Sequence, residues 1–334
     1  MFSAPYATML KPYGEALVEL GTRRPDVLCL SADLTRQCEV DLFRDMLPQQ
    51  FINVGMAEAN MLGIAGALAR RGYKPFVHTF GVFATRRALD QLVNSVAYPD
   101  LPVRIAGFMP GISSPGGPSH QAIEDVALMR AVPNMMVIDL ADASEIRQCV
   151  EAIVDLPHPV YVRLKRGEIP IIFEDDYKLD LTRPVVLRSG SDVAVVANGM
   201  MLPVALAAAE QLQGAGVSVT VVNCPVIKPL NTPALRAALE PCRVVVTAEN
   251  HSVIGGLGSA VAETVAEAGM PARLRRVGLN DTFAEGSLTA PYLFNKYGLT
   301  TQAVVDAAWQ ALEAPGDAPR ADSAPAGIGE YAPV

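Results

Sequence analysis

Residues 135–164 read MMVIDLADASEIRQCVEAIVDLPHPVYVRL, and this stretch decides the fold. An apolar run at 135–140 is followed by an amphipathic segment, Ala141–Val154, and then by a second apolar run at 159–164. Short apolar runs rich in β-branched residues are typical of buried strands, and apolar residues at helical spacing are typical of a helix that covers a sheet. The stretch therefore predicts a strand–helix–strand unit with parallel strands.

The same alternation continues in both directions along the chain. Apolar runs begin near residues 27, 74 and 103, and the segment Ala59–Arg70 between them is amphipathic. After a polar, proline-containing stretch, a second alternating series follows with DVAVVANG, VSVTVVNC and RVVVTAE as its strands. The sequence thus predicts an α/β protein made of two parallel-sheet, three-layer domains.

The polar stretch and the chain end set the predicted domain boundaries. We expect a first domain at 1–175, a linker at 176–190 and a second domain at 191–312. The tail at 313–334 is rich in Ala, Pro and Gly and has few large apolar residues. Such a composition cannot bury enough apolar surface to fold alone, so this tail is expected to be disordered.

Composition excludes several classes of function. The 334 residues are 50% hydrophobic and 19% charged, which is typical of a folded protein, and the net charge is −8, with no stretch that concentrates the positive charge into a stripe. A nucleic-acid binder is therefore not favoured. Without a long apolar run or a secretory signal, a cytoplasmic protein is expected. The five cysteines and four histidines are scattered, so neither a disulfide scaffold nor a protein-built metal site is expected.

Two segments place carboxylate, aromatic and basic residues after predicted strands. VGMAEAN at 54–60 puts Glu58 at the start of a helix. A carboxylate there stabilises the helix dipole by ~0.3–1 kcal/mol, so Glu58 alone does not indicate a site. HTFGVFATR at 78–86 repeats Phe80, Phe83 and Arg86 every three residues. The aromatic pair is typical of a core, whereas an arginine that prolongs an apolar stripe requires an anionic partner.

Two further segments follow strands of the same series. MPGISSPGGPSHQ at 109–121 is a Gly/Pro/Ser-rich loop, and loops at the carboxyl edge of a parallel sheet are where α/β proteins bind ligands. His120 is therefore a candidate site residue, with a turn or helix-capping role as the alternative. YVRLKRGEIP at 161–170 ends a strand with basic residues. Such residues are most often solvated, but an arginine there can also bind a phosphate.

Together these segments resemble the transketolase family, specifically the C-terminal half of a full-length transketolase. LSADLT at 30–35 is similar to the family's SADLT segment, and GMAEAN at 55–60 is similar to the segment with its cofactor-activating glutamate. TFGVF, GPSHQ and RGEIP are similar to its TFxxF, GPTHQ and RQNLP segments, and IKPL and IGGLGS to its C-terminal domain. The resemblance extends from about residue 8 to residue 312.

The resemblance implies thiamine diphosphate as the cofactor of a reaction that cleaves a C–C bond of a ketose. Glu58 matches the glutamate that hydrogen-bonds the aminopyrimidine ring and acts as an acid/base activator. Phe80 and Phe83 match the residues that stack on this ring, and Asp33 matches a carboxylate near the cofactor. Glu58 and His120 are thus the implied catalytic residues.

For the sugar phosphate, the resemblance implies a second set of residues. Arg166 matches an arginine that binds the substrate phosphate, and His120 matches a histidine that lines the substrate channel. Lys11 stands where the family has another phosphate-binding arginine. Arg86 matches a tyrosine of ordinary transketolases and an arginine of deoxyxylulose-phosphate synthases, so we expect it to contact a phosphate or hydroxyl of the substrate, with Arg163 as a further candidate.

Two positions depart from the family pattern. Counting back from His120 without gaps, Phe108 and Gly116 stand where transketolases carry a histidine and an aspartate that contact sugar hydroxyls. Without these two hydrogen-bonding groups the substrate channel would be roomier and less polar. We therefore expect an unusual ketose phosphate, such as apulose 4-phosphate, as a substrate.

The sequence contains no GDG segment, which in the family holds the diphosphate and Mg²⁺. We therefore expect a second, N-terminal transketolase subunit that binds the diphosphate and metal, in an α2β2 heterotetramer. The alternatives are a beta subunit of another thiamine diphosphate enzyme, either a 2-oxo-acid dehydrogenase or a deoxyxylulose-phosphate synthase, and a non-catalytic partner subunit. A dinucleotide-binding site is not favoured, because Val261 stands where the GxGxxG fingerprint that starts at Gly256 requires Gly or Ala.

Overall fold

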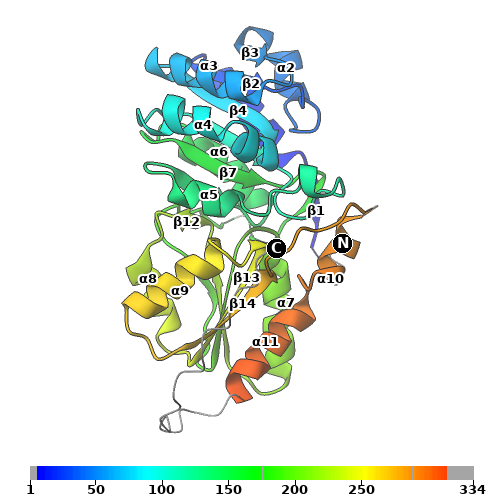
Figure 1. Ribbon diagram of the computed structural model, residues 1–334, viewed down its shortest axis with the longest axis vertical. Helices are drawn as coiled ribbons and strands as arrows, with labels where there is room; N and C mark the ends of the chain where they lie inside the picture. Colours follow the sequence, from blue (N-terminus) through cyan, green and yellow to red (C-terminus); the bar gives the residue numbers. More distant parts are fainter. Residues whose placement is uncertain (1–5, 175, 288, 314–334) are drawn as a thin grey trace, which may run out of the picture.

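The computed structural model describes residues 6–174, 176–287 and 289–313, which form two α/β domains arranged along the long axis of the molecule (Figure 1). The first domain is built on a seven-stranded sheet and the second on a five-stranded sheet. Each sheet is mainly parallel and has helices on both faces. The predicted fold class is thereby confirmed.

Neighbouring strands of the first sheet are parallel, except for one antiparallel pair at its edge. In spatial order the strands are β12 (Val226–Lys228), β6 (Met136–Asp139), β7 (Val160–Leu164), β5 (Arg104–Phe108), β4 (Lys74–Phe80), β2 (Val27–Ser31) and β3 (Phe51–Asn53). The parallel pairing of β6 with β7 confirms the strand–helix–strand unit that residues 135–164 predict.

Alternate residues of these strands face different layers of helices, as the two-residue period of a strand requires. Val27 and Cys29 of β2 belong to one apolar cluster, whereas Leu28 and Leu30 belong to another. The first cluster includes α1 (Pro12–Arg23), α2 (Asp41–Met46) and α6 (Ala143–Ile153). The second includes α3 (Glu58–Arg70), α4 (Leu89–Gln91), the π-helical turn η3 (Leu92–Ala97) and α5 (Asp125–Ala131).

The second domain repeats this three-layer plan. Its strands are, in spatial order, β14 (Arg273–Leu279), β13 (Val244–Ser252), β10 (Val193–Ala197), β11 (Val219–Asn223) and β9 (Val185–Arg188). One face packs against α7 (Leu202–Gly214), α10 (Ala290–Lys296) and α11 (Thr301–Glu313). The other packs against α8 (Thr232–Leu239) and α9 (Leu257–Glu267), so that helices lie on both sides of the sheet in Figure 1.

Two strands do not follow the predicted division into domains. β9 lies inside the predicted linker and pairs antiparallel with β11 of the second sheet. β12 comes from the second half of the chain but pairs antiparallel with β6, which extends the first sheet. The two domains are therefore joined by a shared sheet edge as well as by the linker. The predicted disordered tail lies outside the described residues, apart from Glu313 at the end of α11.

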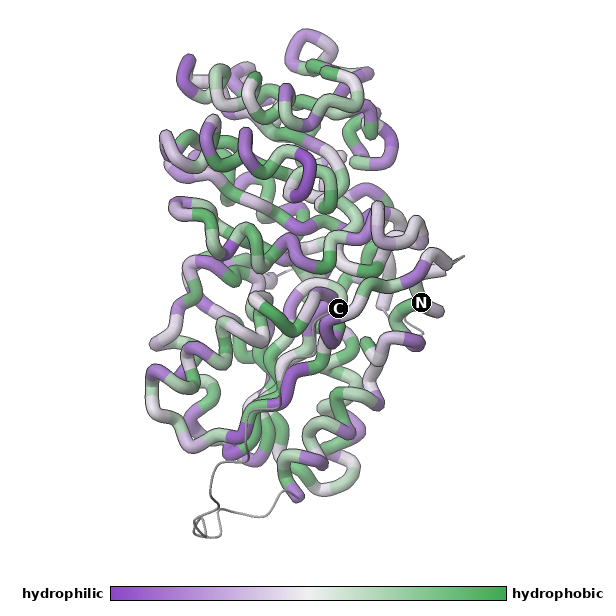
Figure 2. The backbone as a smooth tube through the Cα atoms, viewed as in Figure 1, coloured by the Kyte–Doolittle hydropathy of each residue, from purple (hydrophilic) through white to green (hydrophobic). Residues whose placement is uncertain are grey.

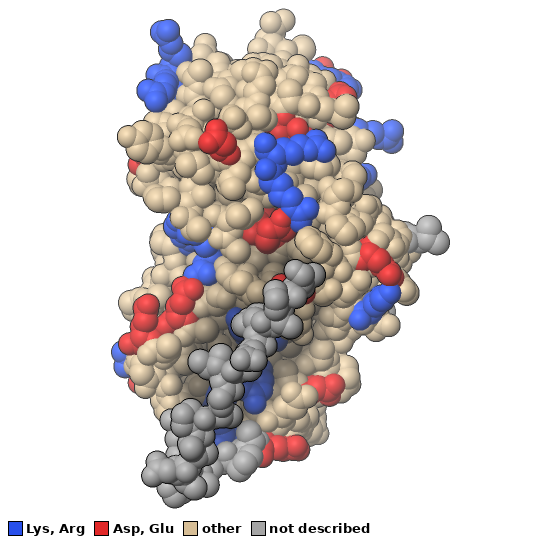
Figure 3. Space-filling view, in the orientation of Figure 1, with Lys and Arg blue, Asp and Glu red and all other residues tan. Residues whose placement is uncertain are grey.

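The distribution of polar and apolar residues follows this layering. Figure 2 shows apolar residues concentrated along the strands and on the helix sides that face them. On the face seen in Figure 3, acidic and basic side chains are interspersed, and no continuous stripe of one charge is visible. Within the described ranges, no helix combines the length and the apolar character needed to cross a membrane.

Candidate active site

The carboxyl edge of the first sheet gathers most of the predicted site residues. Because β2, β3, β4 and β5 are parallel, the segments that follow them emerge at the same edge. These segments carry Asp33 after β2, Glu58 at the start of α3, Phe83 and Arg86 in the π-helical turn η2 (Phe83–Arg87), and His120 in η4 (Pro118–His120). A π-helical turn is rare and is frequently found at functional sites.

Three rings form one aromatic cluster at this edge. Phe80 and Phe83 stack with their centroids 5.7 Å apart and their planes 19° from parallel. His120 lies edge-on to both rings, at 5.3 Å from Phe83 and 6.3 Å from Phe80. Its Nδ1 is 2.9 Å from the hydroxyl of Ser119. The structure thus brings together the two predicted stacking residues and the predicted channel histidine.

Glu58 lies next to this cluster and is bound to an arginine that the sequence analysis did not single out. The Glu58 side chain is 4% exposed, and its Oε1 accepts a hydrogen bond of 3.1 Å from Nη1 of Arg87. The same guanidinium lies over the Phe83 ring, 3.9 Å from its centroid. The sequence did contain one signal that could have identified Arg87: it stands four residues, or about one helical turn, after Phe83. A flat cation therefore covers the ring face and pairs with the buried carboxylate.

Arg86 points to the loop that carries His120. Its Nη1 donates to the carbonyl of Pro118 at 2.8 Å, and its Nη2 donates to the carbonyl of Gln121 at 3.2 Å and to Oε2 of Glu124 at 2.7 Å. Its Nε donates to the other carboxylate oxygen of Glu124, and this bonding raises the pKa of Arg86. Glu124 is thus the anionic partner that the sequence required. These four bonds leave one of the five N–H groups of Arg86, on Nη1, for a substrate contact.

Arg163 is buried between the domains, where internal partners occupy the group that was predicted to contact the substrate. The side chain is 1% exposed, and it donates to Asp125 at 2.9 and 3.1 Å and to Asp139 at 2.7 Å. Nη2 also approaches the carbonyls of Ala122 and Asn250, at 3.3 and 3.0 Å. A guanidinium with this many internal partners and 1% of its side chain exposed is not placed to reach a phosphate from the solvent in this structure.

The two predicted phosphate-binding cations come from neighbouring segments. β1 (Thr8–Leu10) pairs antiparallel with β8 (Glu168–Pro170), which brings Lys11 and Arg166 to one region of the edge. Burial raises the pKa of Glu39 there to about 7. The backbone N–H groups of Gly14 and Gly167 and the positive charges of Lys11 and Arg166 oppose this rise by smaller amounts. Lys11 donates to Asp41 at 2.8 and 3.1 Å, while Arg166 is exposed.

Asp33 is exposed and held in a left-handed backbone conformation, with φ of 61°. Its backbone N–H donates to Oδ1 of Asn53, and Nδ2 of Asn53 donates back to the Asp33 carboxylate, both at 3.2 Å. Aspartate tolerates this conformation better than most residues do. Asn53 therefore connects the end of β3 to the loop after β2, at the point where Asp33 and Glu58 approach the same edge.

The two positions that depart from the family pattern have different surroundings. Phe108 is fully buried, with its ring edge-on to Tyr13 at 5.5 Å, so this side chain lies in the core rather than in an open channel. Gly116 packs against His120, and a Cβ at position 116 would lie 3.0 Å from both Cβ and Cγ of the histidine. A side chain at position 116 would thus touch the His120 ring. The aspartate that the family pattern has at this position, and that this chain lacks, would therefore lie beside the candidate site.

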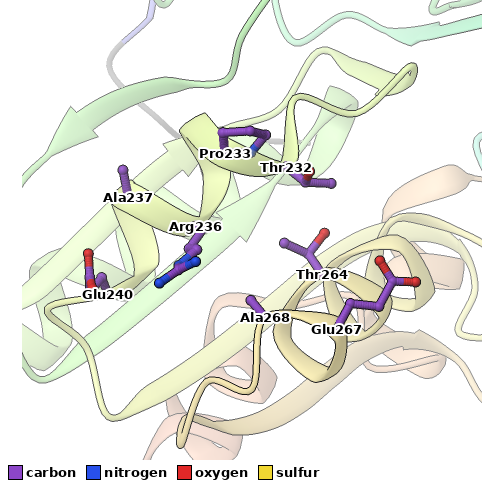
Figure 4. Close-up of a pocket in the computed structure, with 8 residues that line it drawn as sticks. All are labelled: Thr232, Pro233, Arg236, Ala237, Glu240, Thr264, Glu267 and Ala268. Carbon is purple, nitrogen blue, oxygen red and sulfur yellow. The ribbon is translucent and has the colours of Figure 1, made fainter.

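The surface has one cleft near this edge and one groove away from it. A cleft of about 500 Å³ borders Arg86 and Glu124 and is lined on its other side by residues 281–283 of the second domain. The groove in Figure 4, of about 480 Å³, lies between α8 and α9 and contains none of the predicted site residues. In the part of the chain that the structure describes, no group of three or more His, Cys, Asp and Glu side chains is placed to hold a metal ion.

Comparisons with known proteins extend these observations over both domains. Residues 6–171 match the transketolase pyrimidine binding domain, and residues 183–304 match the transketolase C-terminal domain. A 6-deoxy-6-sulfo-D-fructose transketolase subunit of Clostridium sp. is 41% identical over 302 residues, covering 90% of this chain and 93% of the relative. An apulose-4-phosphate transketolase subunit of Phocaeicola vulgatus is 32% identical, covering 88% of this chain and 94% of the relative.

A similar structure has also been solved. It is described as a split gene transketolase, inactive beta4 tetramer, and is 44% identical in sequence to this chain. The TM-score is 0.83, and the match covers 90% of this chain and 97% of the other. The resemblance therefore includes the arrangement of the two domains as well as their sequences.

Proposed function

Because the chain belongs to the transketolase family, we propose that it is the C-terminal subunit of a heteromeric transketolase that uses thiamine diphosphate to transfer a two-carbon ketol unit between sugar phosphates. The observation that carries this proposal is the buried carboxylate of Glu58 beside the stacked rings of Phe80 and Phe83 at the carboxyl edge of the first sheet. The relatives named as transketolase subunits span the same two domains and have nearly the same length.

The residues at this edge fit the aminopyrimidine end of the cofactor. Arg87 covers Phe83 with a planar, nitrogen-rich group and donates to Glu58. An aminopyrimidine ring offers the same two features, a flat face for stacking and a nitrogen that can share a proton with a carboxylate. The site thus already accommodates a group of this shape and bonding pattern, and we infer that the cofactor ring would take the place of the Arg87 guanidinium.

The cofactor, when bound, supplies a centre that stabilises the carbanion formed on C–C bond cleavage. Within this chain, Glu58 would hold the proton at the pyrimidine nitrogen, and Phe80 and Phe83 would hold the ring in place. His120 would line the substrate channel, where its ring is already fixed against Phe83. Asp33 would lie near the cofactor at the same edge.

We assign phosphate binding to Arg166, with Lys11 beside it. Both side chains are cationic and come from segments that the β1–β8 pairing brings together. Arg166 is exposed and can present its guanidinium to a phosphate in a bidentate manner. Lys11 would have to share its ammonium group between Asp41 and the substrate.

A partner chain would supply the remaining half of the site, including the groups that hold the diphosphate and Mg²⁺. The sequence has no GDG segment for this purpose. Met56, two residues before Glu58 in the sequence, is 80% exposed, so its apolar side chain is available to an interface. The solved relative described as an inactive beta4 tetramer supports the idea that such chains need another kind of subunit for activity. An α2β2 heterotetramer is the assembly we propose.

The substrate we propose is an unusual ketose phosphate, such as apulose 4-phosphate. The support is the glycine at position 116, which leaves His120 without an acidic neighbour there, and the relative named as an apulose-4-phosphate transketolase subunit. Purified complex that ignores apulose 4-phosphate but converts xylulose 5-phosphate and ribose 5-phosphate rapidly would contradict this choice while leaving the transketolase assignment intact.

The first experiment is a calorimetric titration with thiamine diphosphate and Mg²⁺. It compares this chain alone, a co-expressed N-terminal transketolase subunit alone, and the mixture. Binding that requires the mixture is expected, and tight binding by the lone chain would overturn the two-subunit site. In the mixture, Glu58→Gln should keep cofactor binding but lose nearly all turnover, because its neutral amide cannot share the ring proton; full turnover would contradict the role of Glu58.

A further inference from the structure

The bonds of Arg86 define a connection between two parts of the proposed site. Arg86 belongs to the same π-helical turn as Phe83, whereas its partners Pro118 and Gln121 lie at the two ends of the short helix η4 that carries His120. Four of its five N–H groups are used in these bonds and in the pair with Glu124. The guanidinium therefore bridges the ring that would stack on the cofactor and the histidine that would line the substrate channel.

We propose that Arg86 is a positioning residue that fixes His120 against Phe80 and Phe83, rather than a residue that contacts the substrate. This inference rests on the proposed function of His120. The segment before His120 reads PGGP at 115–118, and its backbone has little regular structure of its own. Two carbonyl acceptors on either side of the histidine, both bound to one rigid guanidinium, set the distance between η4 and η2.

Glu124 completes this arrangement from the start of α5. Its carboxylate accepts two hydrogen bonds from Arg86, which is 30% exposed in its side chain. A bidentate pair of this kind fixes orientation as well as distance. Removing the guanidinium would leave a cavity lined by one carboxylate and two carbonyls, with access from the cleft of about 500 Å³ that borders both residues. Such a cavity has the shape and charge to bind a free guanidinium ion.

The test uses the assembled enzyme with Arg86→Ala. We expect kcat to fall by about 10- to 100-fold, since small displacements of a site residue have effects of this size, with KM and cofactor affinity nearly unchanged. The loss should be the same for a phosphorylated donor and for an unphosphorylated ketose. Millimolar guanidinium chloride should restore part of the rate, whereas sodium chloride at equal concentration should not. Arg70→Ala, which removes an exposed arginine of α3, is the matched control and should respond to neither salt.

Two further variants separate this role from the alternatives. Arg86→Lys keeps the charge but cannot reach both carbonyls and the carboxylate, so it should recover little activity. The double variant Arg86→Ala, Glu124→Gln should be no slower than Arg86→Ala alone, because the two substitutions break the same connection between η2 and the His120 loop. A defect confined to the KM of phosphorylated donors would overturn the proposal in favour of substrate contact. Unchanged kcat in a folded variant that binds the cofactor would exclude any role, and an inactive wild-type complex would instead refute the proposed function.

Discussion

Arg163→Met tests whether this arginine stabilises the domain interface or binds substrate. The substitution removes the cation but fills most of its volume, and it leaves Asp125 and Asp139 buried, with side chains 0% and 5% exposed. Removing one partner of a buried ion pair costs about 3–5 kcal/mol. Since Asp125 and Asp139 both lose their cation, we expect the upper part of this range. A chain of this length should then unfold at a temperature ~6–7 °C lower.

The dependence of this loss on pH identifies its electrostatic origin. Burial raises the pKa of Asp139, and Arg163 opposes that shift. Without the arginine the folded-state pKa should rise further above the unfolded value, so stability is retained at low pH and lost as the pH rises through the folded-state pKa. The difference in unfolding free energy between Arg163→Met and wild type should therefore shrink between pH 8 and pH 5. Asp139→Asn in the same background should restore part of the stability at pH 8.

Arg104→Met is a matched control on the neighbouring strand. Arg104 is equally buried at 1% exposure, but among the described residues its guanidinium donates to backbone carbonyls alone, those of Val154, Leu156 and His158. Its removal should cost about 1–3 kcal/mol without recovery at low pH. Both variants are measured by urea and thermal unfolding. An Arg163→Met protein of wild-type stability that has lost affinity for phosphorylated donors would refute the structural role and reinstate substrate binding.

Three other substitutions address the proposed cofactor site and the buried acids. Phe83→Leu should weaken thiamine diphosphate binding to the assembled enzyme by about 2- to 10-fold, which corresponds to the loss of one aromatic stacking contact. Unchanged affinity in calorimetry would mean that Phe83 only packs in the core. Arg87→Ala should tighten cofactor binding several-fold, because a cation–π contact and an ion pair worth about 1 kcal/mol together no longer compete for Phe83 and Glu58; weaker binding would mean that Arg87 supports the cofactor instead. Burial raises the pKa of Glu145 to about 7, so its contribution to stability is lost as the pH rises from ~4.3 to 7. Glu145→Gln should flatten the fall in unfolding free energy over that range by up to ~1.4 kcal/mol per pH unit, and an unchanged slope would contradict the shifted pKa.

The fold was predictable because the period of the apolar residues distinguishes strands from helices, as in residues 135–164. What periodicity does not specify is the sheet to which a short strand belongs. β12 has three residues and lies between strands of the second domain in sequence, yet it pairs with β6 of the first. β9 follows a polar stretch and pairs with a single neighbour at the edge of its sheet, so its sequence resembles a linker.

The candidate site was predictable only in part, for a related reason. Glu58, Phe80, Phe83 and His120 are brought together because each follows or ends a parallel strand, which the sequence indicates. The partners of the arginines are not local. Arg163 ends a strand in a basic segment, and Asp125 and Asp139, which lie 38 and 24 residues away, account for its burial. Glu124 is likewise 38 residues from Arg86. A pattern read along the chain shows that an arginine needs an anion but not which anion it finds.

The long loop at 109–121 shows why the second domain matters to a site that lies on the first. Backbone groups in such a loop need hydrogen-bond partners when they are buried. The second domain supplies several: Asn250 accepts from the N–H of Ile112 and donates to the carbonyl of Pro110, and the N–H of Ser287 donates to the carbonyl of Pro115. The carbonyl of Glu285 also accepts from the side-chain amide of Gln121.

These bonds hold the loop from the side of the second domain, while Arg86 holds η4 from the side of the first. Arg163 joins the two supports, because it approaches the carbonyl of Ala122 just after the loop and that of Asn250 in β13. His120 is therefore fixed by contacts from both domains, although none of the second-domain residues reaches its ring in the contacts described. The second domain therefore supports the loop that carries this histidine, and we expect a change in the packing between the domains to alter the position of His120.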